Sequence, residues 1–497
     1  MTQQGEVEAG SPTGDARATT PAGLDATQGM GPVFMLRGMA GERVALRALV
    51  ARPDVAPPPM LTADGSAVEP TSLLRLDGML VLAYDFTLPL ARDVGYRFDG
   101  EDYRVDCALE GDLRIAYVSC NGQESGDRKR SLDERNVLWR RLARQHEAAP
   151  FHLLLQGGDQ IYADEVASLH KRARHNPLAA WSYRVEGDIG PLREAMRREL
   201  FRRYLELYRQ PKVAWMVARV PTLAIWDDHD ICDGWGSLPP ERMDSPFGRA
   251  VFAVARELYL LFQQGAVAPD YPPAFGDRSG TSLGWHLRLP GLDVVAPDLR
   301  SERRRNRVMG DSGWQMLRDA LAEARSGRVL LLSSVPALGP RLSWVEAVMS
   351  VTPRMEKYED DLRDQWQSHA HREEWRRFLR LLIETHTRDT TPVTVLSGEI
   401  HLATRGTMDT PEGPLHQLVA SGISHPAPPT AYARALSLLA RFGEAPLPEH
   451  PISLHPLPGR SMIYTAQRNY LVLERRDGRW QAWWELENDG PTPPLEL

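Results

Sequence analysis

Residues 227–230, with the sequence Asp-Asp-His-Asp, place three carboxylates and one imidazole in four consecutive positions. Like charges at this spacing repel one another, and the repulsion grows when the groups are withdrawn from water. A bound cation or full exposure to solvent would offset that cost. An acidic surface loop is the simpler alternative, but the apolar run 223–226 predicts a buried strand, and open α/β sheets bind ligands at strand ends. The sequence therefore predicts a metal-binding loop here.

Three further apolar runs end in side chains that can bind a metal. These side chains are, in chain order, Cys120, Asp159 with Tyr162, and Glu399 with His401. Each has a simpler explanation when taken alone: a buried thiol, a capping or turn carboxylate, a packed tyrosine, or a hydrogen-bonded Glu–His pair. Glu399 and His401, two residues apart on a segment that we predict to be extended, should point to the same face. Because the carboxyl ends of parallel strands meet at one edge, all four groups can converge.

The mixture of ligand types predicts two different ions. Carboxylates and a phenolate suit hard cations, whereas a thiolate and imidazoles favour a transition metal. Two ions a few ångströms apart can generate hydroxide and neutralise a phosphoryl oxygen during in-line displacement. His229 is then a candidate for protonating or stabilising the leaving oxygen. Arg300, after another apolar run, could hold phosphate oxygens through both prongs of its guanidinium, while for residues 303–307 a solvated helix face is the better interpretation.

The elements that must position these residues follow an α/β pattern. From residue 113 onward, short apolar runs alternate with segments of helical periodicity, which is typical of βαβ units. The pattern predicts helices over 132–146, 247–264, 311–326 and 365–386. An Asp-Gly pair inside residues 470–487 predicts a C-terminal hairpin. The proline-rich stretch 427–458 is expected to be irregular.

The first quarter of the chain has a different character. Residues 1–31 contain almost no large apolar side chain and are predicted to form a disordered tail. Residues 32–110 consist of short runs of Val, Leu, Phe and Tyr between turn residues, which predicts a small N-terminal β-sandwich domain. Residues 111–497 would then form the larger α/β domain, with a mostly helical insertion at about 165–212.

Composition excludes several classes of protein. The 497 residues carry a formal charge of −7 and give a pI near 6.1, which argues against a nucleic-acid-binding surface and against attraction to an anionic membrane. Three cysteines form no spaced framework, so a disulfide scaffold is not expected. The first twenty residues show neither a signal peptide nor a twin-arginine motif, and no apolar stretch is long enough to form a transmembrane segment. The expected compartment is the cytoplasm.

Six short motifs in this order resemble the PhoD-type alkaline phosphatases and phosphodiesterases, a divergent branch of the calcineurin-like metallophosphoesterases. The motifs are VSC at 118–120, GGDQIYAD at 157–164, WDDHD at 226–230, DLRSERR at 298–304, LSGEIH at 396–401 and ASGIS at 420–424. The resemblance implies a four-layer αββα sandwich preceded by an N-terminal β-sandwich. It further implies a metal shell, with Asp159 bridging, that consists of Cys120, Asp159, Tyr162, Asp228, Glu399 and His401.

The same resemblance implies the ions, Fe3+ with Ca2+ as its partner; Mn2+ and Zn2+ are alternatives. The chain also departs from the family pattern. Glu399 stands where PhoD-like members have an aspartate one methylene shorter, and the twin-arginine signal common in the family is missing. A tyrosine often lies between the two arginines of the family's phosphate-side motif. Here Ser301 to Arg303 intervene, which makes Arg304 a weaker match than Arg300.

The leading hypothesis is a metal-dependent phosphoesterase, a phosphoric ester hydrolase that attacks phosphomonoesters or phosphodiesters with metal-activated hydroxide. Its substrate would be a small phosphoester. One alternative is a catalytically silent, metal-stabilised scaffold whose β-domain and proline-rich stretch bind a partner protein. Another is a metal-free α/β protein with an acidic pocket. The enzyme is favoured because a scaffold has no need of His229 and Arg300 at the edge that carries the ligands.

Overall fold

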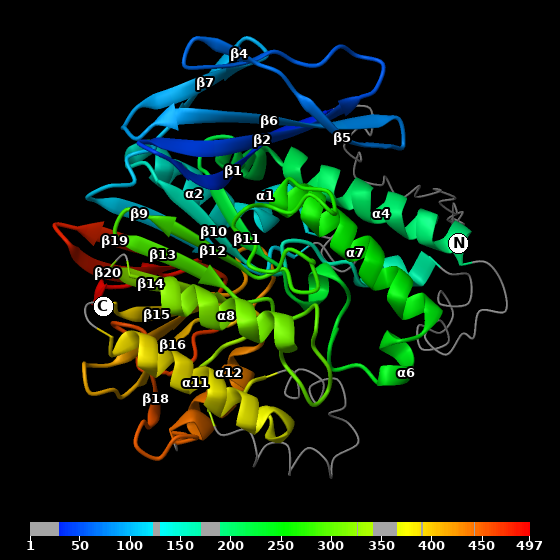
Figure 1. The fold of residues 1–497 in the computed structure, drawn as a ribbon. Coiled ribbons are helices and arrows are strands. Elements are labelled where there is room, and N and C mark those ends of the chain that lie inside the picture. The colour runs from blue at the N-terminus through cyan, green and yellow to red at the C-terminus, as the bar shows by residue number, and fades with distance from the viewer. Residues whose placement is uncertain are drawn as a thin grey trace, which may run out of the picture.

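Two large sheets form the centre of the molecule (Figure 1). The computed structural model describes residues 29–122, 130–169, 189–325, 327–340, 365–388, 391–441 and 443–497. The eleven-stranded sheet has the order β21 (Gly490–Pro491), β20 (Arg479–Leu486), β19 (Asn469–Arg476), β9 (Leu113–Val118), β10 (Leu153–Gly157), β11 (Thr222–Ile225), β1 (Met30–Ala40), β2 (Arg43–Pro53), β6 (Met79–Pro89) and β5 (Thr71–Leu76), with β22 (Leu495–Glu496) paired to β20. The seven-stranded sheet has the order β12 (Trp285–Leu289), β13 (Leu292–Ala296), β14 (Arg328–Ser333), β15 (Val393–Ser397), β17 (Leu415–Val419), β16 (Thr404–Met408) and β18 (Ile452–His455).

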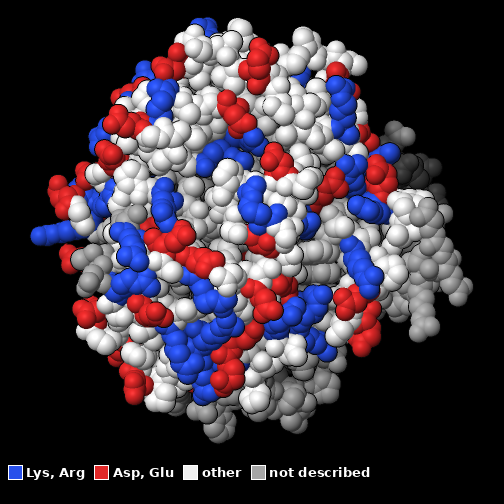
Figure 2. Space-filling model, in the orientation of Figure 1, with Lys and Arg blue, Asp and Glu red and all other residues white. Residues whose placement is uncertain are grey.

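Helices cover these sheets. On the eleven-stranded sheet lie α2 (Val137–Ala148), α4 (Gly190–Arg209), α5 (Pro211–Val217) and α7 (Pro246–Gln264), and on the seven-stranded sheet lie α8 (Asp311–Glu323) and α11 (Arg372–His386). The other helices within the described residues are α1 (Leu132–Arg135), α6 (Pro240–Met243) and α12 (Thr430–Ala440), with 3-10 turns at η2 (Asp164–Leu169), η3 (Asp228–Asp230) and η5 (His369–His371). On the face shown in Figure 2, acidic and basic side chains interleave across these helices.

Alternate residues of the seven-stranded sheet face two different cores. Val294 and Leu330 pack in the large core that both sheets share. Their neighbours Val295 and Leu331 pack in a second core with residues of α8 and α11. This two-residue period is what a sheet buried on both faces requires. The predicted α/β fold with four αββα layers is therefore confirmed.

Parallel pairing brings the carboxyl ends of several strands to the same edge of each sheet. β9, β10 and β11 are parallel neighbours, with Gln156 opposite Val118 and Gly157 opposite Ile225. In the second sheet β15 is parallel to β14 and β17, and its last residue, Ser397, lies opposite Val419. The predicted ligands follow four of these strands: β9, β10, β11 and β15.

The N-terminal region is made of strands, as predicted, in two layers at the top of Figure 1. The second layer is a four-stranded sheet in which β4 (Ser66–Val68), β3 (Leu61–Ala63), β7 (Val94–Phe98) and β8 (Glu101–Val105) follow one another. Phe34 and Tyr96 stack between the layers with ring centroids 5.1 Å apart. The first layer consists of β1, β2, β6 and β5 and is part of the eleven-stranded sheet, because β1 pairs in parallel with β11. The domain boundary near residue 110 therefore stays a prediction.

Several element predictions were wrong in detail. The stretch 427–458 contains α12 and β18, because Ala433 and Ala440 of α12 bury against Leu402 and Tyr464, and the prolines lie outside these elements. The helix predicted over 132–146 is interrupted at Asn136, whose side chain donates a hydrogen bond to Gln210 (2.7 Å). The helix predicted from 365 begins at 372.

Parts of two predicted segments lie outside the described residues. These parts are 1–28 of the predicted tail and 170–188 of the predicted insertion. β1 starts at Met30, just inside the predicted tail. Among the described residues, no helix has the length and apolar content needed to cross a membrane.

Candidate metal centre

Four of the predicted ligands sit in left-handed backbone. Cys120, Asp159, Glu399 and His401 have φ values of 51°, 56°, 66° and 51°. The expectation that residues 399–401 are extended was therefore wrong: the chain turns sharply after β15. A left-handed non-glycine residue costs about 1 kcal/mol or more and persists only where its surroundings hold it. Here the turns direct side chains from three strand ends into one region.

A glycine allows two of these loops to approach closely. Gly158, with φ of 101°, lies directly after β10, and a Cβ placed on it would be 2.7 Å from Cβ of Asp227. No other residue fits between the loops after β10 and β11. The close approach places Asp159 next to the acidic loop that follows β11.

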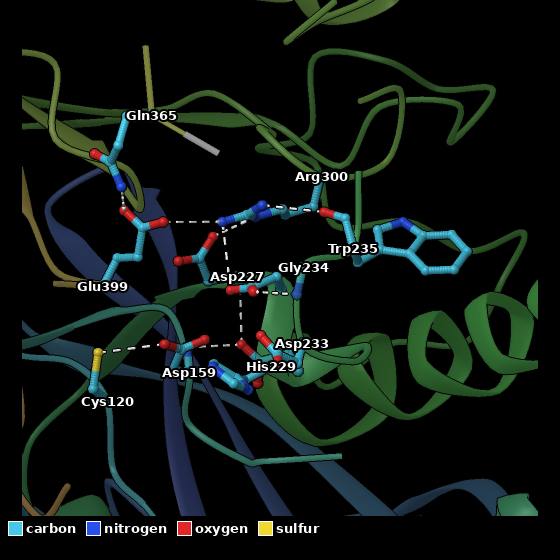
Figure 3. A network of polar contacts seen from close by, with 12 residues as sticks. Cys120, Asp159, Asp227, His229, Asp233, Gly234, Trp235, Arg300, Gln365 and Glu399 are labelled. Atoms are coloured by element: carbon cyan, nitrogen blue, oxygen red, sulfur yellow. Dashed lines mark hydrogen bonds and ion pairs between the residues drawn. The ribbon is translucent and has the colours of Figure 1, made fainter. Parts of the chain in front are cut away.

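The first group of candidate ligands consists of Cys120, Asp159 and His401, whose ligand atoms lie within 4.8 Å of one another. Sγ of Cys120 is 3.4 Å from Oδ2 of Asp159 (Figure 3) and 3.1 Å from Oγ of Ser421. The hydroxyl of Tyr162 is 3.1 Å from Nε2 of His401. The structure thus places a thiol, a carboxylate, an imidazole and a phenol together, as predicted.

The second group consists of Asp159, Asp228 and His229, again within 4.8 Å. Asp159 belongs to both groups, which is the bridging position implied for it. Its carboxylate is 1% exposed, and Oδ1 has no hydrogen-bond partner among the described residues. A buried carboxylate oxygen without a donor is costly. A cation beside Asp159 would satisfy this oxygen, so these residues fit a two-ion centre.

The pKa shifts of the buried candidate ligands also favour a bound cation. Burial, together with the nearby Asp227 carboxylate, raises the pKa of Asp159 well above its usual range. Burial and the Asp159 carboxylate likewise raise the pKa of the Cys120 thiol. Burial and the neighbouring His425 and His229 lower the pKa of His401, which favours the neutral imidazole that a metal requires. Positive charge placed among these groups would stabilise the thiolate and carboxylate and release their protons.

The carboxylates of the acidic loop have different partners. Asp227 pairs with the guanidinium of Arg300. Asp228 accepts from the backbone N–H of Gly234 (2.8 Å) and lies 3.4 Å from Nη2 of Arg300. Asp230 is fully buried and accepts from the backbone N–H groups of Asp159 and Asp227, both at 2.9 Å. Asp227 is therefore neutralised by Arg300, Asp230 ties the two loops together, and Asp228 is the carboxylate of this loop that could bind an ion.

Arg300 and Glu399 lie beside the candidate ligands, at the predicted edge, but their side chains contact other protein groups. Arg300 is 0% exposed and donates to Trp235 O (3.1 Å) as well as to the aspartates (Figure 3). Glu399 lies outside both ligand groups: its Oε1 is 3.8 Å from Arg300, and its Oε2 accepts from Gln365 (2.9 Å). The prediction of a helix over 303–307 was wrong, and Arg303 is fully buried with its methylenes packed against Gly236, whereas residues 305–307 are exposed as predicted.

Sequence reasoning missed Asp164, which lies at the end of the GGDQIYAD motif. Its Oδ2 accepts from Nδ1 of His229 at 2.9 Å, and its Oδ1 accepts from the backbone N–H of Asp233. Burial lowers the pKa of His229, but the carboxylates of Asp164, Asp228 and Asp159 together raise it, so that it ends well above its usual range. The ring of Tyr162 stacks on His229 with centroids 4.3 Å apart. The only sequence signal was the presence of a second carboxylate in the motif.

Three comparisons relate the chain to known proteins. A family model described as PhoD related phosphatase matches residues 108–358, slightly more than half of the chain. The curated protein YGR266W of Saccharomyces cerevisiae, described as uncharacterized, is 24% identical over 411 residues; the match covers 67% of this chain and 57% of that protein. The chain thus spans little more than half the length of that relative. A solved structure described as Structure of PhoD matches with a TM-score of 0.59 at 13% identity, covering 95% of this chain and 90% of the other, which shows a common fold.

Proposed function

Since this chain belongs to the family of PhoD-related phosphatases, we propose that it is a metal-dependent phosphoesterase that hydrolyses phosphomonoesters or phosphodiesters. Family membership supports phosphatase activity in general. The observation that carries the more specific proposal is the pair of ligand groups that share Asp159 at one sheet edge. Two ions in such a pair of sites can generate a hydroxide nucleophile and neutralise the phosphoryl oxygens.

The two groups differ in the ions that they suit. Cys120 and His401, with Tyr162 beside them, supply sulfur, nitrogen and phenolic oxygen, a set that favours a transition metal; the family resemblance names Fe3+. Asp159 and Asp228 supply carboxylate oxygens that suit a harder divalent ion such as Ca2+. We assign these residues to hold the ions, and leave Glu399 outside the set on the strength of its contacts with Arg300 and Gln365.

His229 is the candidate for proton transfer to the leaving oxygen. Its Nδ1 is engaged with Asp164, so this nitrogen is fixed and Nε2 is the one that can face the substrate. The Asp164 carboxylate favours the protonated imidazole, which is the form that can donate a proton to an alkoxide or phenolate as it leaves. Asp164 then acts on the reaction through His229, as an orienting carboxylate.

Arg300 supplies the positive charge that lets the acidic loop form. A buried guanidinium next to Asp227, Asp228 and Glu399 offsets the repulsion among these three carboxylates. Its predicted contact with substrate phosphate would require one of these pairs to open. We therefore propose that Arg300 positions Asp228.

Hydrolysis assays test the proposal directly. The purified full chain is assayed with p-nitrophenyl phosphate and bis(p-nitrophenyl) phosphate, as isolated, after chelation, and after adding back Fe3+ with Ca2+, Mn2+ or Zn2+. We expect turnover that is lost on chelation and restored by at least one metal combination. His229→Ala should lose turnover, whereas His450→Ala, a histidine bonded to the backbone carbonyl of Asp409, should not.

The scaffold alternative gives a different pattern in the same experiment. It predicts bound metal, no turnover with any metal combination, and unchanged stability of His229→Ala. Element analysis that finds no metal after growth and purification without chelators would favour the acidic-pocket alternative. The cytoplasmic location stays a prediction, to be checked by fractionation.

A further inference from the structure

His425 contacts His401 and Cys120 of the first ligand group and the neighbouring Tyr162, although the sequence alone indicated no role for it. Its ring lies 3.6 Å from the ring of His401, centroid to centroid, with an interplanar angle of 18°. It also stacks against Tyr162 at 5.4 Å and 15°. Its backbone N–H donates to the carbonyl of Cys120 (3.1 Å), so the loop after β17 is tied to the loop after β9. His425 is thus part of the wall of the candidate metal centre.

The protonation of one nitrogen follows from its partner. Nδ1 of His425 is 2.9 Å from the carbonyl oxygen of Pro426. A carbonyl can only accept, so Nδ1 must carry a hydrogen. The ring is therefore held in one orientation by its own chain, with one face against His401.

This geometry argues against His425 and His401 sharing an ion. The lone pair of an imidazole nitrogen lies in the plane of its ring, and a metal binds about 2 Å away along that direction. Two nearly parallel rings 3.6 Å apart direct their lone pairs along separate planes, which do not meet at one ion. His425 therefore contacts His401 through the face of its ring and not through a ring nitrogen.

We propose that His425 is a positioning residue that fixes the ring plane of His401. The backbone of His401 is left-handed and is anchored by a hydrogen bond from its N–H to Oγ of Ser421 (2.8 Å). The same Ser421 hydroxyl contacts Sγ of Cys120. The loop after β17 therefore holds the first ligand group at three points: Ser421 fixes the His401 backbone and the Cys120 sulfur, and His425 fixes the His401 imidazole.

The inference rests on the proposed function only in taking the first group as an ion site. Its test is Co2+ titration of the full chain after chelation, read by the thiolate-to-cobalt absorption that Cys120 provides. His425→Ala should weaken Co2+ binding about 10-fold, the effect of removing a group that orients a ligand. His425→Phe keeps a flat ring without nitrogens and should bind Co2+ within about twofold of the unchanged protein. His450→Ala is the matched control, a histidine whose Nδ1 also meets a backbone carbonyl.

Two results would overturn the inference. Unchanged Co2+ binding in His425→Ala would show that the stacked ring is not needed. An equal loss of Co2+ affinity in His425→Phe and His425→Ala would show that a ring nitrogen of His425, and not its flat face, is required. Thermal unfolding of the chelated variants reports whether each is folded. Because Co2+ binding is read without substrate, a protein that binds Co2+ but hydrolyses no phosphoester would refute the proposed function and leave this inference standing.

Discussion

Left-handed residues other than glycine occur in two kinds of place in the described chain, and the comparison separates two uses of backbone strain. In exposed turns and loops between strands they are all aspartates: Asp64, Asp77, Asp93, Asp99 and Asp477. At the candidate metal centre they are Cys120, Asp159, Glu399 and His401, which are buried or partly buried. Aspartate tolerates this conformation because its short side chain bonds locally. Cysteine, glutamate and histidine have much less of that tendency.

The difference shows whether the backbone conformation selects the residue type or the surrounding contacts impose the conformation. At the turns, the backbone conformation selects the residue, and four of the five aspartates precede a glycine. At the metal centre, contacts from other loops impose the conformation. The backbone N–H of Cys120 donates to Gly158 O (3.1 Å), and that of Asp159 donates to Asp230 (2.9 Å). Strain held in place by distant parts of the chain is a common property of functional sites.

The largest expected effect follows from replacing the residue that both ligand groups share. Asp159→Asn should lose both ions and reduce turnover roughly 10³-fold or more, since the nucleophile depends on the ions. The chelated variant should be more stable than the chelated parent by about 1 kcal/mol, because a buried carboxylate next to Asp227 and Asp228 is gone. Phosphoester hydrolysis, element analysis and urea unfolding measure the three quantities.

Asp99→Asn is the matched control, since it makes the same chemical change at a left-handed aspartate in a turn. It should alter neither metal content nor turnover. If Asp159→Asn kept its metals, the sharing of Asp159 between two ions would be wrong. The left-handed backbone at Asp159 would then have no demonstrated link to metal binding.

A smaller effect is expected where a carboxylate acts through a second residue. Asp164→Asn should lower kcat about 10- to 100-fold, because His229 loses the charge that keeps it protonated and oriented. The loss should be greater for an alkyl phosphate than for p-nitrophenyl phosphate, since the alkoxide needs a proton more. Asp106→Asn, which alters a separate carboxylate–histidine pair with His152 (3.5 Å), is the control. Equal losses with both substrates would remove His229 from the proton-transfer step.

The sequence was sufficient to predict the strands and the residues at their ends. Runs such as 153–157 and 393–397 are short, rich in aliphatic residues and followed within two residues by a carboxylate, so both their strand type and the chemistry of their ends can be predicted locally. Cys120, Asp159, Tyr162, Asp228 and His401 are brought together as expected. The residues that directly follow a short, largely apolar run were thus the easiest to place.

What the sequence could not provide was the direction of individual side chains. The left-handed turn at Glu399 depends on neighbours from other elements, and so does the turning of its carboxylate toward Arg300 and Gln365. Asp164 could not be distinguished from a solvated acid without knowing that η2 packs beside η3. Arg303 lies in a run of arginines that has the composition of a surface, yet tertiary packing buries it.

Glu399→Gln tests where the boundary of the metal centre lies. Because Glu399 is outside both ligand groups, metal content should stay unchanged and turnover should fall less than about 10-fold, while stability drops by about 1 kcal/mol as Arg300 loses one neighbouring carboxylate. Element analysis decides the matter. Loss of one equivalent of metal would instead place Glu399 in the shell that the family resemblance implies.

The smallest effects are expected at the turn between β7 and β8, where Asp99 and Gly100 both have positive φ (49° and 88°). A two-residue turn of this type accepts asparagine as readily as aspartate, so Asp99→Asn should change the free energy of unfolding by less than about 0.5 kcal/mol. Asp99→Val places a β-branched residue in left-handed backbone and should cost about 1–2 kcal/mol. Both variants should hydrolyse phosphoesters like the parent. If Asp99→Val were as stable as the parent, left-handed backbone would carry little cost in this protein, and the four left-handed residues at the candidate metal centre would need no special support from the loops around them.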